Sequence, residues 1–181
     1  MRRLLLSAAL LAGVMVLAAG CGGDSGSSSG SSAADWADGY CKDATSWVTS
    51  LDEARASVKT GTTPEEAAQA VTDESNSFIQ SIDDLGAPDT PDGSTSEATA
   101  KSLATTLSGR VARISGAIDT NNPDVGVAQQ TAIVQQQIAA SLTDIKTTNA
   151  KLAQDDAELG TAMTASAECT SLDAALAKAS A

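Results

Sequence analysis

The sequence predicts an all-α protein whose body is an antiparallel bundle of about four helices, the last of them long and broken. Three observations favour this class. The chain from residue 34 onward is rich in Ala, Gln, Glu, Leu and Lys, which are good helix formers. Its apolar residues recur at spacings of three and four, and no run alternates Val, Ile, Tyr or Phe as a strand would. Gly, Asn and Pro divide this region into four segments, which we assign to one domain at residues 34–181.

The first two helices are expected at residues 34–59 and 64–85. Gly61 follows the end of the first, and Gly86 ends the second. The second helix has a clear start, with Thr63 as N-cap, Pro64 as first helical residue and Glu66 completing a capping box. The apolar face of the first helix consists of Trp36, Tyr40, Ala44, Trp47, Leu51, Ala54 and Val58, and that of the second of Ala67, Val71, Ser75, Phe78, Ile82 and Leu85.

A loop rich in Pro and Gly, residues 86–93, separates the second helix from the third. Ser94 and Glu97 have the spacing of another capping box, which predicts a helix start there. Asn121 and Asn122 mark the end of this helix, and Pro123 is placed to begin the fourth. The third helix would bury Ala100, Leu103, Leu107, Val111, Ile114 and Ile118. The apolar face of the fourth consists of Val127, Thr131, Val134, Ile138, Leu142, Ile145, Leu152, Leu159 and Met163, and Asn149 and Asp156 interrupt it.

The N-terminal region has the composition of a targeting segment. Arg2 and Arg3 precede an apolar run over residues 4–17, which has the length of a signal-peptide core and is short for a spanning helix. The string Leu17-Ala18-Ala19-Gly20-Cys21 resembles the lipobox of bacterial lipoproteins, although Ala18 stands where Leu is usual. The resemblance covers residues 1–21 and implies removal of residues 1–20 and a diacylglyceryl group on Cys21. An exported protein with Cys21 as a spare thiol is the alternative.

Residues 22–33 are mostly Gly and Ser and are expected to form a flexible linker behind the lipidated Cys21. Two or more acyl chains anchor a protein stably to a membrane. We therefore expect a protein held by its lipid on the extracytoplasmic face of the cell membrane. Such a protein resembles the small bacterial lipoproteins of unknown function, and its high content of Ala, Gly, Thr and Asp indicates an actinobacterial-type source.

The cysteine count predicts a disulfide between Cys41 and Cys169. Three cysteines are an odd number for an exported protein, and lipidation of Cys21 leaves these two as a pair in an oxidising compartment. The loop between them spans nearly the whole body, so the bond would stabilise it by roughly 5 kcal/mol. Two free buried thiols, or a pair of metal ligands, are the alternatives.

The predicted disulfide requires the fourth helix to break. A straight fourth helix would place Cys169 about 69 Å from its start, whereas Cys41 lies about 27 Å from the end of the first helix. The two cysteines would then be roughly 40 Å apart along the bundle, but a disulfide needs Cα atoms within about 7 Å. We therefore expect a break near Asn149 or Gly160, with strongly staggered helices as the alternative.

Composition disfavours several classes of function. The sequence has no His, so it offers no imidazole base, nucleophile pair or His-ligated metal. Its net charge of −12 disfavours nucleic acid as a partner. Neighbouring carboxylates on a helix point about 100° apart and make no catalytic dyad. We expect no enzyme, metal or cofactor, and we interpret as solvated the pairs Asp52-Glu53, Glu65-Glu66, Asp83-Asp84 and Asp155-Asp156, with Glu158 beside the last.

Two groups of residues are candidates for binding. Trp36, Tyr40 and Trp47 share one face of the first helix and are interpreted as core anchors, with a ligand pocket at that end of the bundle as the alternative. Five glutamines are interpreted as polar surface or as a partner-binding face. They are Gln129, Gln130, Gln135, Gln136 and Gln137. The sequence therefore favours a protein that binds an envelope protein or a cell-wall component, with a small-ligand module as the alternative.

Overall fold

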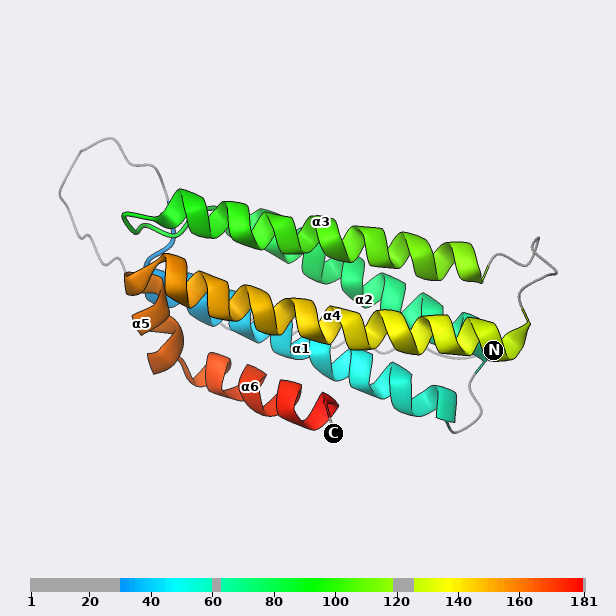
Figure 1. Cartoon of the computed structure of the whole chain (residues 1–181). Helices are drawn as coiled ribbons and strands as arrows, with labels where there is room; N and C mark the ends of the chain where they lie inside the picture. The colour runs from blue at the N-terminus through cyan, green and yellow to red at the C-terminus, as the bar shows by residue number, and fades with distance from the viewer. Residues whose placement is uncertain (1–29, 60–62, 119–125, 181) are drawn as a thin grey trace, which may run out of the picture.

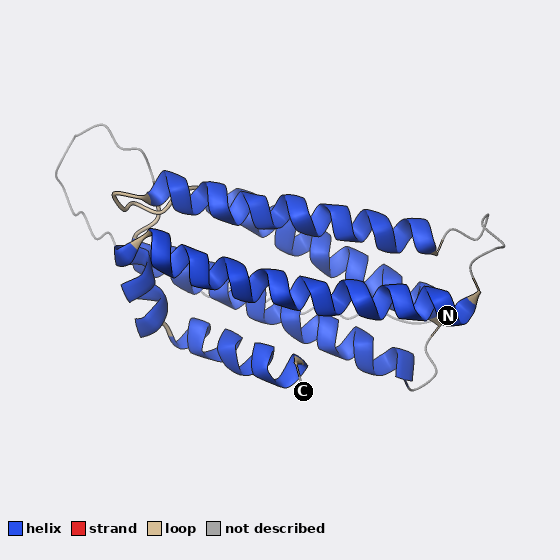
Figure 2. Ribbon diagram, in the orientation of Figure 1, coloured by secondary structure: helices blue, strands red, loops and turns tan. Residues whose placement is uncertain are grey.

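The structure is a computed structural model of the chain, and it describes residues 30–59, 63–118 and 126–180. These ranges are all-helical and contain no strand (Figure 2), which confirms the predicted all-α class. Six helices are present within them, rather than about four. They are α1 (Ala33–Lys59), α2 (Pro64–Leu85), α3 (Gly93–Ala117), α4 (Val127–Asp155), α5 (Ala157–Ala165) and α6 (Ala167–Ala179).

The four long helices α1–α4 lie side by side, and each is antiparallel to the one before it in the chain (Figure 1). α2 packs between α1 and α3, and α4 packs on α3. α5 turns across the end of α4, and α6 then runs back along α1. Because α1 has extensive contacts with both α2 and α6, it is the central helix of the bundle and carries the most completely buried face.

The predicted fourth segment breaks twice, at Asp156 and at Ser166. The predicted break is therefore confirmed, but its expected place is wrong, because Asn149 lies inside α4 and Gly160 inside α5. Asp156 and Ser166 have extended backbone, and each side chain accepts a hydrogen bond from an amide in the first turn of the helix that follows. Such side-chain acceptors satisfy the free amides of a new helix start and compete with continuation of the old helix.

The start of α2 is as predicted. The hydroxyl of Thr63 accepts from the amide of Glu66, and the carboxylate of Glu66 accepts from the amide of Thr63, each at 3.3 Å. Pro64 is the first helical residue, and Gly86 follows the helix with a φ of 62°, a left-handed conformation that Gly adopts without a steric penalty.

The predicted capping box of α3 is wrong. The helix begins at Gly93, and Asp92 precedes it as an N-cap without a side-chain hydrogen bond. A Cβ at Gly93 would collide with the carbonyl of Pro88, so the loop packs tightly against this glycine. The helix therefore starts one residue before Ser94. Glu97 pairs instead with Lys101 at 2.6 Å.

The predicted ends of α3 and α4 fall partly outside the described residues. Asn121, Asn122 and Pro123 lie there, while α3 ends at Ala117 and α4 begins after Gly126, an extended N-cap. The expected core position Val127 is wrong, since its side chain is 64% exposed at the first turn of α4. Most other predicted core positions are buried. Five are only partly buried: Leu85, Val111, Ile118, Thr131 and Met163. The side chain of Val58 is not among those described.

The last residues of the predicted linker belong to the folded body. The amide of Asp89 donates a 2.8 Å hydrogen bond to the carbonyl of Ser31, and Ala33 is already the first residue of α1. Gly30 packs so closely on the α2–α3 loop that a Cβ there would lie 3.0 Å from the carbonyl oxygen of Ala87. The chain therefore joins the bundle at the end formed by this loop. The predicted signal peptide, Cys21 and linker residues 22–29 lie outside the described residues.

None of the helices in the described ranges combines the length and apolar character needed to cross a membrane.

Candidate functional site

The aromatic residues of α1 form the centre of the core. Trp36 stacks on Tyr40 with ring centroids 5.2 Å apart, and Trp47 stacks on Phe78 of α2 at 5.0 Å. Tyr40 and Phe78 join the two pairs in a tilted contact at 6.2 Å. The side chains of Trp36, Tyr40 and Trp47 are at most 1% exposed. They are core anchors, and a ligand could reach Trp36 or Tyr40 only if the helices separated, whereas Trp47 borders a small groove between α1 and α2.

Each polar atom of these rings has a partner on another element. Trp36 donates through Nε1 to the carbonyl of Gly86 at 2.9 Å, and Trp47 donates through Nε1 to the hydroxyl of Ser75 at 3.1 Å. The Tyr40 hydroxyl donates to the side-chain oxygen of Asn149 at 2.9 Å. Burial raises the pKa of Tyr40 well above its ordinary value, so this phenol stays neutral and acts as a donor.

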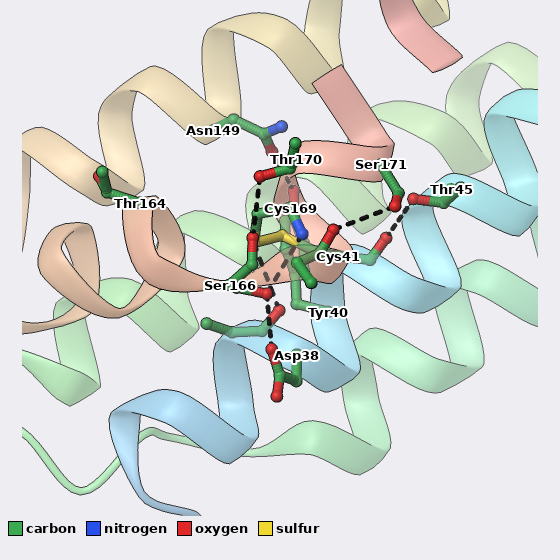
Figure 3. The surroundings of a disulfide bond; sticks show 12 residues. Asp38, Tyr40, Cys41, Thr45, Asn149, Thr164, Ser166, Cys169, Thr170 and Ser171 are labelled. Carbon is green, nitrogen blue, oxygen red and sulfur yellow. Dashed lines mark hydrogen bonds between the residues drawn. A yellow bond between two sulfur atoms is a disulfide. The ribbon is translucent and has the colours of Figure 1, made fainter. Parts of the chain in front are cut away.

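Cys41 and Cys169 form a disulfide with Cα atoms 4.8 Å apart, as the cysteine count predicts. The bond joins α1 to the first turn of α6 (Figure 3). Two polar contacts reinforce the same junction. Ser166, just before α6, donates to the carboxylate of Asp38 on α1 at 2.5 Å, and Lys178 pairs with Asp52 at 3.3 Å near the other end of α6. α6 is therefore fixed to α1 at both ends.

A groove of about 410 Å³ lies over this disulfide, between α4, α5 and α6. It exists because α6 packs closely on α1 but touches α4 little. Cys41 and Cys169 form part of its lining. Lys146, Asn149 and Asp173 supply polar groups. The apolar lining comes from Ala150, Ala153, Met163, Leu172 and Leu176. An apolar lining with a few polar groups is the usual character of a small-molecule site.

Asn149 connects this groove to the aromatic core. Its side-chain oxygen accepts from Tyr40, and Tyr40 stacks on Trp36, while Asn149 itself lines the groove. The sequence marks Asn149 only as an interruption of an apolar face. Its partner lies 109 residues away, so no local pattern could reveal this role.

Asp156 is buried, and its interpretation as a solvated carboxylate is wrong. Only 1% of it is exposed. The carboxylate accepts from the hydroxyl of Thr90 at 2.5 Å, from that of Ser96 at 3.0 Å and from the amide of Leu159 at 3.0 Å. Burial raises the pKa of this carboxyl, but the hydrogen bonds outweigh burial and hold the pKa below its ordinary value. It is therefore a charged structural cap.

The neighbouring carboxylates are surface groups. Asp155 pairs with Lys151 one turn earlier in α4, and Glu158 is exposed. Within the described ranges, no group of three or more His, Cys, Asp or Glu side chains is placed to hold a metal ion.

The glutamines of α4 do not form one surface. Gln129 and Gln136 are exposed and Gln135 is half-buried, but Gln130 and Gln137 are only 7% and 8% exposed. Gln137 accepts a hydrogen bond of 3.4 Å from Arg110 of α3. Arg110 also pairs with Asp144 at 2.6 Å, so Gln137 faces α3 rather than an outside partner.

Comparison with protein-family models, curated proteins and solved structures finds no match to this chain.

Proposed function

We propose that this protein is a lipid-anchored, extracytoplasmic helical-bundle protein that acts by binding a protein or a cell-wall component of the envelope. The disulfide is the observation that carries the proposal. It accounts for two of the three cysteines and leaves Cys21, at the end of the lipobox-like string, for another role. Disulfides persist in exported proteins and are rare in the cytosol.

The point where the chain enters the bundle indicates which end would be tethered to the membrane. Eight residues lie between Cys21 and Gly30, so the two are at most about 30 Å apart along an extended chain. Gly30 packs on the α2–α3 loop, so that end of the bundle would face the lipid. α1 has 27 residues and is about 40 Å long, which leaves the sides and the far end of the bundle open to partners.

Metabolic labelling with a palmitate analogue tests the anchor. The wild-type protein is expected in the membrane fraction with the label, and Cys21→Ser is expected to lose both the label and the membrane association. The double variant Cys41→Ser/Cys169→Ser is the matched control, because it keeps Cys21 and is expected to stay labelled. An unlabelled wild type, or a labelled Cys21→Ser protein, would contradict the proposal. Crosslinking on intact cells then tests binding, and no envelope partner would count against it.

The groove over the disulfide favours a second candidate function, a small-ligand module. Its volume of about 410 Å³ lies within the usual range for ligand pockets. A ligand there would contact Asn149, which is joined to Trp36 through Tyr40, so tryptophan emission is expected to change on binding.

Fluorescence titration with a panel of small molecules tests this candidate. Ala150→Leu would fill the groove and abolish the response, whereas Ala139→Leu, on an exposed part of α4 outside the groove, would leave it intact. An unresponsive wild type, or equal effects of the two variants, would rule the groove out.

A further inference from the structure

Among the described helices, α2 carries the most carboxylates. This helix carries six carboxylates and no Lys or Arg, and all six are exposed. α3, by contrast, carries Glu97 together with Lys101, Arg110 and Arg113. The carboxylates of α2 extend from Glu65 to Asp84, about 29 Å along the helix. They are Glu65, Glu66, Asp73, Glu74, Asp83 and Asp84.

A small groove of about 130 Å³ runs between this helix and α1. Asp43 of α1 and Glu74 of α2 contribute its carboxylates, and Trp47 and Phe78 form its apolar part. Three serines complete the lining: Ser46, Ser77 and Ser81.

The hydrogen bonding of these lining residues favours a ligand that donates hydrogen bonds. The hydroxyls of Ser46, Ser77 and Ser81 donate to backbone carbonyls of their own helices, at 3.3, 3.1 and 2.9 Å. The indole N–H of Trp47 already donates to the hydroxyl of Ser75 in the core. The described side chains of the groove therefore present acceptors: two carboxylates and the lone pairs of three hydroxyls. A Lys ammonium or an Arg guanidinium supplies donors and positive charge, and its aliphatic stem fits against apolar surface.

We propose that the α1–α2 groove is a docking surface for a basic segment of a partner protein, with one Lys or Arg side chain seated between Asp43 and Glu74. A single small cation would need only the groove. A polypeptide with several cations also matches the row of carboxylates along α2, and complementary charge speeds and orients such an encounter. The inference names the chemistry of the binding partner and rests on the proposed function only in taking that partner to be a protein.

Titration calorimetry of the folded, disulfide-bonded body with decalysine tests the docking surface. Decalysine is expected to bind at low ionic strength and to weaken as salt is added, and decaglutamate is expected not to bind. Asp43→Asn/Glu74→Gln is expected to weaken decalysine binding by about tenfold. Glu53→Gln/Glu158→Gln removes the same charge from exposed positions outside the groove and is expected to change the affinity less than twofold.

A third variant fills the groove from within. Ser77 is exposed, so Ser77→Lys is expected to fold normally by circular dichroism and to place its own ammonium beside Glu74, which would abolish the decalysine site. Equal weakening by the two charge-matched double variants, unchanged binding to Ser77→Lys, or affinity for spermine equal to that for decalysine would each overturn the proposal. These outcomes are separate from palmitate labelling, so either inference can fail alone.

Discussion

The carboxylate of Asp156 accepts a 2.5 Å hydrogen bond from the hydroxyl of Thr90, and this contact joins the end of α4 to the loop between α2 and α3. The same carboxylate accepts from Ser96 of α3 and caps α5 through the amide of Leu159. Because Asp156 is 1% exposed, water cannot replace these partners. One side chain thus holds three elements together and ends α4.

Replacement of Asp156 by Asn is expected to destabilise the protein by roughly 2–4 kcal/mol. The change removes the charge that strengthens three hydrogen bonds and weakens the cap of α5. The control is Asp155→Asn, which removes only an exposed pair with Lys151 and is expected to cost less than about 1 kcal/mol. Urea unfolding with the disulfide intact measures both, and equal losses would show that the buried network contributes nothing.

The lowered pKa of Asp156 predicts that the protein loses stability in acid. Its hydrogen bonds, acting against burial, hold its pKa below the ordinary value of 3.8. A group with a lowered folded-state pKa contributes stability that is complete above its unfolded pKa and is lost as the pH falls through the folded value. The free energy of unfolding is therefore expected to fall below about pH 4. The difference between wild type and Asp156→Asn should shrink over the same range, and a constant difference would contradict this assignment.

The sequence predicts those features of the fold that depend on neighbouring residues. The capping box of Thr63 and Glu66 and the glycine that ends α2 act within one helical turn, so their spacing is sufficient. The core faces follow in the same way from the period of the helix. The odd cysteine count and the length of a helix together indicate both the disulfide and a break in the last segment.

The features that depend on distant residues could not be predicted. Asp156 ends α4 because Thr90 and Ser96, some 60 residues earlier, supply its partners, and the local sequence favours Asn149 or Gly160 equally. Gln137 is buried because Arg110 of α3 reaches it. The groove over the disulfide depends on how α6 packs against α1, which no pattern within α6 specifies.

Gly160 is expected to be intolerant of a side chain. A Cβ there would lie 2.5 Å from the carbonyl oxygen of Ala153, because α5 folds back closely on α4. Gly160→Ala should therefore destabilise the protein by roughly 1–3 kcal/mol through overpacking. Gly109, in the middle of α3, has open space around its Cβ position, so Gly109→Ala should stabilise by about 0.5–1 kcal/mol. Thermal unfolding of the two variants tests this, and a Gly160→Ala protein at least as stable as the wild type would contradict the close approach of α5 to α4.

Removal of the disulfide is expected to destabilise the whole body. Cys41 and Cys169 are separated by 128 residues, so the bond restricts most of the unfolded chain. Cys41→Ser/Cys169→Ser should lower the free energy of unfolding by roughly 3–5 kcal/mol. Amide exchange should accelerate most in α6, which the bond fixes to α1.

The matched control for the disulfide is Lys178→Ala, which removes the ion pair between the far end of α6 and α1. Lys178 is 76% exposed in its side chain, so the loss of its pair with Asp52 should cost less than about 1 kcal/mol. Addition of a reductant to the wild type should reproduce the unfolding curve of the double serine variant and leave that variant unchanged. If reductant leaves the wild-type curve where it was, the two cysteines are not bonded, and the attachment of α6 rests on its apolar packing and polar contacts.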